Sequence, residues 1–150
     1  MKVSKKCLEM IKHHEGVRPK PYKCPAGLWT VGVGHVIGDG KTLPPEWDRK
    51  FSSDEIDSIL AADLRRFERG VLRLCPNHLT QSRFDALVSF AFNVGLGSLQ
   101  RSTLRMKHNR GEFDACSKEF LKWSKVGGKV LRGLLNRRKD EAKLYASESN

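Results

Sequence analysis

The sequence predicts a mainly helical α+β fold with a small β-hairpin lobe, a long connecting helix and a larger helical lobe. Apolar residues recur at helical spacing along most of the 150 residues. One stretch, from Arg18 to Pro45, is instead rich in proline, glycine and β-branched residues. No repeat or flexible linker divides the chain. We therefore expect a single domain over residues 1–150, with the small lobe at about 15–52, the connecting helix at about 54–74 and the helical lobe at 75–150 together with the first helix.

The first helix is predicted from Ser4, which can cap it, to about His14. Apolar residues follow the cap at helical intervals: Cys7, Leu8 and Ile11. Glu15 would then stand where the helix gives way to a tight loop at Gly16.

The stretch from Arg18 to Pro45 is the only β-prone region that the sequence indicates. Residues 29–34, Trp-Thr-Val-Gly-Val-Gly, are typical of a short strand, and residues 38–40, Gly-Asp-Gly, of a turn.

Helical spacing then returns for the rest of the chain. Ser52 and Glu55 form a capping-box pattern ahead of a long amphipathic helix from Asp54 to about Leu74. Thr80 can cap a helix that is apolar nearly all round and stops at Gly95, as expected of a central core helix. Shorter helices are predicted around Leu104–Asn109, Glu112–Trp123 and Asn136–Ala146.

Composition is ordinary except for the charge. Hydrophobic residues make up 39% and charged residues 30%, as in globular proteins, and no apolar run is long enough to span a membrane. The net charge of +11 favours acidic polymers or surfaces as partners. The basic residues are spread along the chain without a nucleic-acid-binding motif, so we expect a diffuse positive surface and no specific nucleic-acid site. The first residues do not have the pattern of a signal peptide, which predicts a cytoplasmic location until release.

The four cysteines lie far apart, without the close pairs typical of zinc sites, so we expect no metal and no cofactor. Cys7 and Cys116 fall on apolar helix faces and are predicted to pack as small hydrophobic residues. Cys24 is different, because it stands in the loop-and-strand stretch.

Glu15, Cys24 and Thr30 follow one another with eight and five residues between them. This pattern resembles the catalytic signature of the phage lysozymes, glycoside hydrolase family 24, in which the middle position is Asp or Cys. Residues 30–35 are similar to that family's T-x-G-x-G-H strand, residues 92–95 to a helix end that lines its cleft, and residues 133–141 to its G-L-x-x-R-R-x-x-E segment. The resemblance covers nearly the whole chain in order and implies a lysozyme-like two-lobed fold.

The resemblance assigns Glu15 as the proton donor to a glycosidic oxygen, and partial burial would help to keep it protonated. It assigns Cys24 and Thr30 jointly to the water on the opposite face of the sugar. Three interpretations of Cys24 stay open: a thiolate base or nucleophile, a thiol that helps to place the water, or a spectator beside Thr30. Lys20 and Lys23 are near enough in sequence to favour the thiolate.

Histidine is the usual acid–base residue near neutral pH, so a catalytic role for His35 is one interpretation. We favour a structural ion pair or hydrogen bond, with Asp63 on the long helix as its partner, because the resemblance already supplies Glu15 as the acid.

By resemblance, four further residues face the saccharide: Val36, Phe92, Ser102 and Thr103. For Phe92, plain core packing is an equal alternative, because the surrounding run is apolar. We predict that Trp47 and Trp123 lie in the core.

The implied activity is that of an endolysin, a muramidase that hydrolyses the β-1,4 bond between N-acetylmuramic acid and N-acetylglucosamine in peptidoglycan and so causes host-cell lysis. One alternative is a lytic transglycosylase; another is a non-catalytic cationic binder of anionic polymers or membranes. We expect a monomer that contacts peptidoglycan and, electrostatically, the anionic outer membrane. By resemblance, a separate pore protein would release it from the host cytoplasm into the periplasm.

Overall fold

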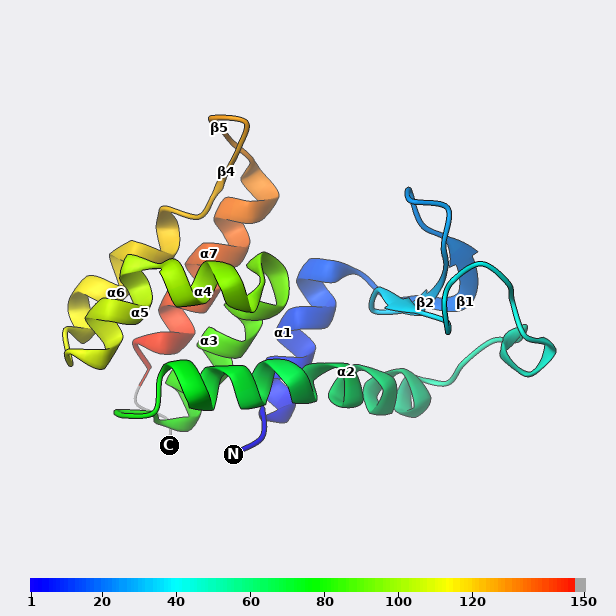
Figure 1. The fold of residues 1–150 in the computed structure, drawn as a ribbon, viewed down its shortest axis with the longest axis horizontal. Coiled ribbons are helices and arrows are strands. Elements are labelled where there is room, and N and C mark those ends of the chain that lie inside the picture. The colour runs from blue at the N-terminus through cyan, green and yellow to red at the C-terminus, as the bar shows by residue number, and fades with distance from the viewer. Residues whose placement is uncertain (148–150) are drawn as a thin grey trace. The chain divides into compact units, whose positions relative to one another are not determined.

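The computed structural model describes residues 1–147 and confirms the mainly helical α+β fold (Figure 1). The chain groups into two compact units, which are described separately. The sheet unit comprises Leu8–Leu64; the helical unit comprises Met1–Cys7 and the chain from Arg65 onward. The predicted lobe boundaries stay a prediction.

The sheet unit holds most of the first helix, a three-stranded sheet and the first half of the long helix. Its elements are α1 (Lys5–Glu15), β1 (Arg18–Lys23), β2 (Trp29–Gly32), β3 (His35–Val36), the 3₁₀ turn η1 (Pro45–Trp47) and the start of α2 (Ser53–Leu74). The Ser4 hydroxyl accepts a hydrogen bond from the Cys7 N–H at 3.2 Å, which confirms the predicted cap of α1.

The sheet has the order β1-β2-β3 and is antiparallel throughout. The strand predicted from Trp29 forms β2, the middle strand, and the predicted turn at Gly38–Gly40 is closed by a hydrogen bond from the Gly40 N–H to the Ile37 carbonyl. The register of β1 is irregular, because residues 19–21 stand opposite the single residue Val31. Pro19 and Pro21 have no N–H to give to the ladder, which accounts for the bulge.

Helix α2 begins as the sequence predicts. The Glu55 N–H donates to the Ser52 hydroxyl at 3.1 Å and the Ser52 N–H donates to the Glu55 carboxylate at 2.9 Å, which is a complete capping box. One stripe of the helix is buried: Ile56, Leu60, Leu64, Phe67, Val71 and Leu74.

The helical unit is built around α3 (Gln81–Val94), in which nine of fourteen residues are buried. The Thr80 hydroxyl caps it by accepting from the Arg83 N–H at 3.1 Å. Both features confirm the predicted central helix. Around it lie α4 (Leu96–Arg101), α5 (Thr103–Asn109), α6 (Phe113–Leu121), β4 (Lys125–Val126), β5 (Lys129–Val130) and α7 (Arg132–Tyr145), with α7 packed on both α3 and α6.

Three elements of the helical unit differ from the prediction. Helix α4 was not predicted; it starts directly after Gly95, which ends α3. Helix α7 begins four residues before the predicted Asn136. The β4–β5 hairpin shows that the first β-prone region is not the only one; its Gly127-Gly128 turn between two Lys-Val pairs is a hairpin signal that the strong helical spacing on either side obscured.

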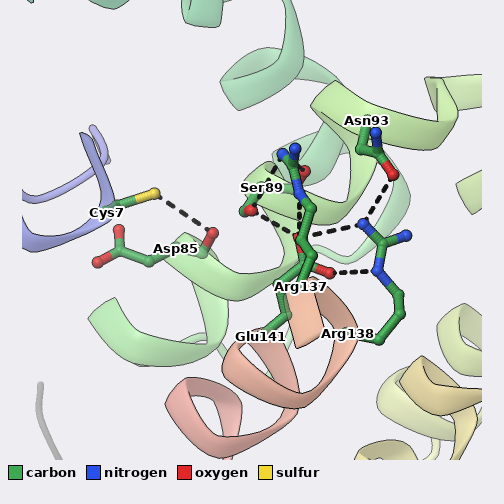
Figure 2. Close-up of polar contacts among 7 residues, drawn as sticks. All are labelled: Cys7, Asp85, Ser89, Asn93, Arg137, Arg138 and Glu141. Carbon is green, nitrogen blue, oxygen red and sulfur yellow. Dashed lines mark hydrogen bonds and ion pairs between the residues drawn. The ribbon is translucent and has the colours of Figure 1, made fainter. Parts of the chain in front are cut away.

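A buried ionic cluster joins α7 to α3 (Figure 2). The Glu141 carboxylate lies 2.9 Å from Arg138 Nε and 3.2 Å from Arg137 Nε, and it accepts the Ser89 hydroxyl at 2.6 Å. Arg138 also donates to Asn93 Oδ1 at 2.8 Å. Burial raises the pKa of Glu141, an effect that the two guanidinium groups oppose. The R-R-x-x-E segment is therefore part of the core of this unit.

The cysteines are all free, and Cys7, Cys75 and Cys116 are buried, as predicted for Cys7 and Cys116. The prediction of a core position is wrong for both tryptophans. Trp47 and Trp123 are half-buried, because neighbours cover only part of each ring: Phe51 and His35 pack on Trp47, and Phe90 meets Trp123 edge-on. None of the helices among residues 1–147 is long and apolar enough to cross a bilayer.

Candidate active site

Glu15 is the last residue of α1, where the sequence predicted it. The helix ends there because the Gly16 N–H turns back to the Lys12 carbonyl at 2.9 Å, with Gly16 in the left-handed region. The Glu15 side chain is exposed, so the expectation of partial burial is wrong for the protein alone. Glu15 is followed directly by a tight turn, and the end of the helix alone does not cover its side chain.

Cys24 follows β1 directly and begins a tight loop. The Gly27 N–H donates to the Cys24 carbonyl at 2.7 Å, and the Cys24 N–H donates to the Leu28 carbonyl at 2.9 Å. Pro25 starts the turn and Gly27, with φ of 79°, completes it in a conformation that favours glycine. The loop is thereby held in one shape, with several backbone N–H groups close to the thiol.

The pKa of the Cys24 thiol is lowered from its usual value. The largest cause is a hydrogen bond from the Leu28 backbone; the Ala26 backbone and the Thr30 hydroxyl add to it, while burial opposes it. The backbone, rather than Lys20 or Lys23, thus makes the largest contribution to favouring the thiolate. The Lys23 ammonium lies instead over the Trp29 ring, 5.4 Å from its centroid.

Thr30 lies on the middle strand, is 2% exposed and stands opposite Val36 in the register with β3. Its hydroxyl donates to the Leu28 carbonyl at 2.9 Å. A hydroxyl carries one proton, so Thr30 can donate to a Cys24 thiolate only by leaving Leu28. While bonded to Leu28 it can accept a hydrogen bond from a thiol or a water. Val36 itself is exposed, as a residue that faces a ligand must be.

His35 contacts the partner that was predicted for it. Its Nδ1 lies 2.9 Å from Asp63 Oδ2 and 3.1 Å from Oδ1, and the Asp63 hydrogen bond raises the pKa of His35. The other side of the imidazole is occupied by the Trp47 ring, stacked at 5.8 Å between centroids. These contacts hold β3 to α2 and to η1, as a structural role requires.

The remaining predicted residues belong to the helical unit. Phe92 is half-buried and meets the Phe67 ring edge-on at 5.2 Å, so its packing is partly that of a core residue. Ser102 is 3% exposed, and its hydroxyl caps α5: it donates to the Leu99 carbonyl at 2.7 Å and accepts from the Arg105 N–H at 3.0 Å. Thr103, the first residue of α5, is exposed.

Two features around Cys24 were not predicted from the sequence. The Leu28 and Ala26 backbones act through main-chain groups, which every sequence has, so only the Pro25 and Gly27 turn pattern could have indicated them. Among residues 1–147, no group of His, Cys, Asp and Glu side chains is arranged to hold a metal ion.

Known proteins resemble the chain along almost its whole length. The family model described as "Phage lysozyme" matches residues 12–141. An endolysin of Acyrthosiphon pisum secondary endosymbiont phage 1 is 38% identical and covers 98% of this chain and 99% of its own length. The endolysin of Bacillus phage B103 is 42% identical over 97% of this chain, but the chain spans only 54%, about half, of that relative. Among solved structures, a mutant of P22 lysozyme superposes with a TM-score of 0.88 at 30% identity, covering 98% of this chain and 99% of that one.

Proposed function

The chain belongs to the phage lysozyme family, and from this premise we propose that it is an endolysin muramidase that hydrolyses the β-1,4 bond between N-acetylmuramic acid and N-acetylglucosamine in peptidoglycan. The main support for the proposal is the arrangement of a glutamate, a cysteine and a threonine in the sheet unit. There an exposed glutamate ends a helix, and the strand that follows leads to a cysteine whose surroundings favour the thiolate beside a buried threonine hydroxyl.

Glu15 would donate its proton to the leaving glycosidic oxygen. A saccharide laid over an exposed carboxyl displaces water from it, which favours the protonated form that a general acid needs. The charge that develops on the sugar ring is that of an oxocarbenium ion, and the group on the opposite face must supply or hold a water.

Cys24 and Thr30 would act on that water. The lowered pKa of Cys24 supports the thiolate interpretation over the neutral thiol and over the spectator. A thiolate can accept a proton from water, and the Thr30 hydroxyl can accept a second hydrogen bond that orients the same water. Val36, Phe92, Ser102 and Thr103 are proposed saccharide contacts, with Ser102 acting through its place in the α5 cap.

The test is turbidity loss of permeabilised Gram-negative cells. We expect Glu15→Gln to lose at least about 1,000-fold in rate, because the amide has no proton to donate near neutral pH. Glu9→Gln is the matched control, since Glu9 is an exposed glutamate of the same helix paired with Lys12, and it is expected to clear the cells as the unmodified protein does. If Glu15→Gln clears them equally well, the effect is electrostatic and the muramidase proposal fails.

A lytic transglycosylase would also use one acidic glutamate, but it closes a 1,6-anhydro ring without water. Two groups suited to holding water favour hydrolysis. Mass spectrometry of digested sacculi separates the two activities: reducing ends with added water support the proposal, and anhydro ends contradict it.

The site of action is the cell wall, as for endolysins in general. We further propose that the protein is a monomer and that a separate pore protein releases it from the host cytoplasm. Its charge of +11 would bring it into electrostatic contact with the anionic outer membrane.

A further inference from the structure

We propose that the β4–β5 hairpin and the residues beside it, 121–132, form a docking surface for anionic phospholipid bilayers; this region is called the hairpin surface below. The inference deepens the membrane contact proposed above by assigning it to one surface, and it does not depend on the muramidase activity. It rests on the apolar exposure of this region, on its charge and on the way the hairpin is anchored.

The hairpin surface exposes apolar side chains that the fold leaves uncovered. Exposed fractions are 59% for Val126, 52% for Val130, 46% for Leu131 and 38% for Leu121. These four make up half of the exposed large apolar residues in the described part of the chain. Single exposed apolar residues need no explanation, whereas a cluster in one twelve-residue stretch indicates a surface that meets something apolar.

The hairpin surface is basic. Residues 121–132 contain four lysines and arginines and no acidic residue. All four are exposed, but the Lys122 ammonium is paired with the Glu119 carboxylate at 2.8 Å, so the net positive charge of the surface comes from Lys125, Lys129 and Arg132. The surface therefore attracts anions over a distance of about 10 Å at roughly 0.1 M salt.

Basic and apolar residues alternate across the hairpin. Lys125 is opposite Val130, and Val126 is opposite Lys129, so each face of the ribbon carries one of each kind. This pattern suits entry tip-first into the boundary between headgroups and acyl chains. The valines would lie among the first methylenes, while the flexible lysine stems would reach back to the phosphates.

The tip of the hairpin is open to solvent, and its base is fixed by contacts with the rest of the helical unit. Gly127 and Gly128 have φ of 57° and 81° and form a tight turn with nothing within 4 Å of either Cβ position, so the tip stands in open solvent. In Figure 1 the hairpin projects beyond α6 and α7, the helices that it joins. At its base the Leu131 N–H donates to the carbonyl of the buried Ser124 at 3.0 Å, and the Trp123 ring packs on Phe90.

A hollow of about 360 Å³ lies at this base, and Asn93, Lys122, Trp123 and Lys125 contribute to its walls. The Lys125 ammonium and the Asn93 amide are suited to a phosphate, whereas Lys122 is paired with Glu119. The Trp123 indole is suited to the interfacial depth of a bilayer. The hollow therefore offers room for a phospholipid headgroup beside the inserted tip.

The apolar residues decide between classes of partner. A soluble polyanion, such as nucleic acid or a cell-wall polymer, gains nothing from exposed valine and leucine, and its binding depends on the lysines alone. Both kinds of side chain strengthen binding to an anionic bilayer. The apolar residues are buried among the lipids, and the basic residues are attracted to the anionic headgroups.

The experiment measures co-sedimentation of the full chain with vesicles of phosphatidylcholine and phosphatidylglycerol (7:3), and with phosphatidylcholine alone. The apolar variant is Val126→Thr with Val130→Thr, which keeps the branched shape, and its control is Met106→Gln, an exposed apolar residue of α5. The charge variant is Lys125→Gln with Lys129→Gln, and its control is Lys5→Gln with Lys6→Gln on α1, which removes the same charge from another surface.

We expect preferential binding to the anionic vesicles, a loss of about tenfold in the apolar variant, a loss of about 25-fold in the charge variant, and changes below about threefold in both controls. Glu15→Gln should bind vesicles like the unmodified protein, so a failed muramidase proposal would not affect this result.

Three outcomes would overturn the inference: equal binding to both vesicle types, equal losses in a variant and its control, or an apolar variant that binds vesicles normally. If the hairpin variants lose binding to purified sacculi but not to vesicles, the surface belongs to the cell-wall polymer instead.

Discussion

At the scale of single residues, the surroundings of Cys24 favour the ionised form of its thiol. A carboxyl group in water is already ionised at neutral pH. A free thiol near its usual pKa is mostly protonated at neutral pH and is then a poor base. The loop from Cys24 to Leu28 lowers the pKa of the thiol, because its backbone N–H groups and the Thr30 hydroxyl stabilise the thiolate. The other three cysteines lie in apolar surroundings, and burial raises the pKa of each, that of Cys75 to about 12.

The contrast between the cysteines predicts selective alkylation. In the folded protein, iodoacetamide should modify Cys24 at least about 100-fold faster than Cys7, Cys75 or Cys116, because only Cys24 is both accessible and poised as a thiolate. The pH midpoint of its reaction should lie below that of a cysteine in a model peptide. Peptide mass mapping after timed alkylation measures both. Thr30→Val, which removes one hydrogen-bond donor, should raise the midpoint; an unchanged midpoint would show that the hydroxyl does not contribute.

Two substitutions test whether Cys24 takes part in the reaction or is a spectator. Cys24→Asp restores a carboxylate and should retain lytic activity, whereas Cys24→Ala removes the group that accepts a proton and should lose most of it. If the alanine variant keeps full turnover on cell walls, Cys24 is a spectator and Thr30 alone places the water.

The His35–Asp63 pair predicts a pH-dependent stability. The pKa of His35 is raised in the folded state by the Asp63 carboxylate, so the pair's contribution is fully present below about pH 6.5, the unfolded value, and is lost as the pH rises through the folded pKa. His35→Asn should therefore cost about 1 kcal/mol more at pH 5.5 than at pH 8.5. Urea unfolding at the two pH values measures the difference. Asp63→Asn should show the same dependence, and equal costs at both pH values would exclude a charged pair.

At the scale of elements, one close approach ties α2 to α4. Gly70 is buried in α2, and a Cβ built at this position would collide with the Leu96 side chain. Glycine usually weakens a helix interior by about 1 kcal/mol relative to alanine. Here that cost is offset because the missing Cβ lets the first residue of α4 pack directly on the α2 backbone.

This approach predicts that Gly70→Ala destabilises the protein by about 1–3 kcal/mol, since overpacking outweighs the gain in helix propensity. The matched control is Gly133→Ala in α7, where a Cβ meets nothing within 4 Å, and it should be neutral or slightly stabilising. Thermal unfolding monitored by circular dichroism compares the two. Leu96→Ala should remove most of the penalty when combined with Gly70→Ala; additive losses would place the strain elsewhere.

At the scale of the whole molecule, the charge of +11 predicts long-range attraction to the proposed substrate. Peptidoglycan and the surfaces around it carry carboxylates and phosphates, so a positive chain is drawn to them over long range. Salt screens this attraction over about 10 Å at roughly 0.1 M and about 3 Å at 1 M.

The charge predicts that the lytic rate on permeabilised cells falls steeply, by about tenfold or more, between low salt and about 0.5 M NaCl. The thermal unfolding midpoint should change little over the same range, because the buried cluster of Arg137, Arg138 and Glu141 is screened weakly. Measuring both on the same samples separates loss of attraction from loss of structure. A flat salt profile for the rate would mean that binding to the wall depends on local contacts alone.

Most of the local structure could be predicted from the sequence, because it depends on residues that are near one another in the chain. The capping box at Ser52 and Glu55, the Thr80 cap, the apolar helix that ends at Gly95 and the strand from Trp29 are all of this kind. The family signature at Glu15, Cys24 and Thr30 is also local, since its spacing follows from one helix end, one strand and one turn.

Only the tertiary structure decided how far side chains are covered and which distant groups meet. Burial of Glu15 was expected and is absent, and Trp47 and Trp123 are half-buried, because exposure depends on neighbours that the local sequence does not name. The backbone around Cys24 lowers its pKa through main-chain N–H groups, at which only the Pro25 and Gly27 turn pattern hints in the sequence. The fold also places the exposed β4–β5 hairpin between two predicted helices, where no strand was predicted. Sequence thus determined the family and named the candidate reacting groups, while packing determined their environment, because burial and electrostatics are properties of the assembled chain.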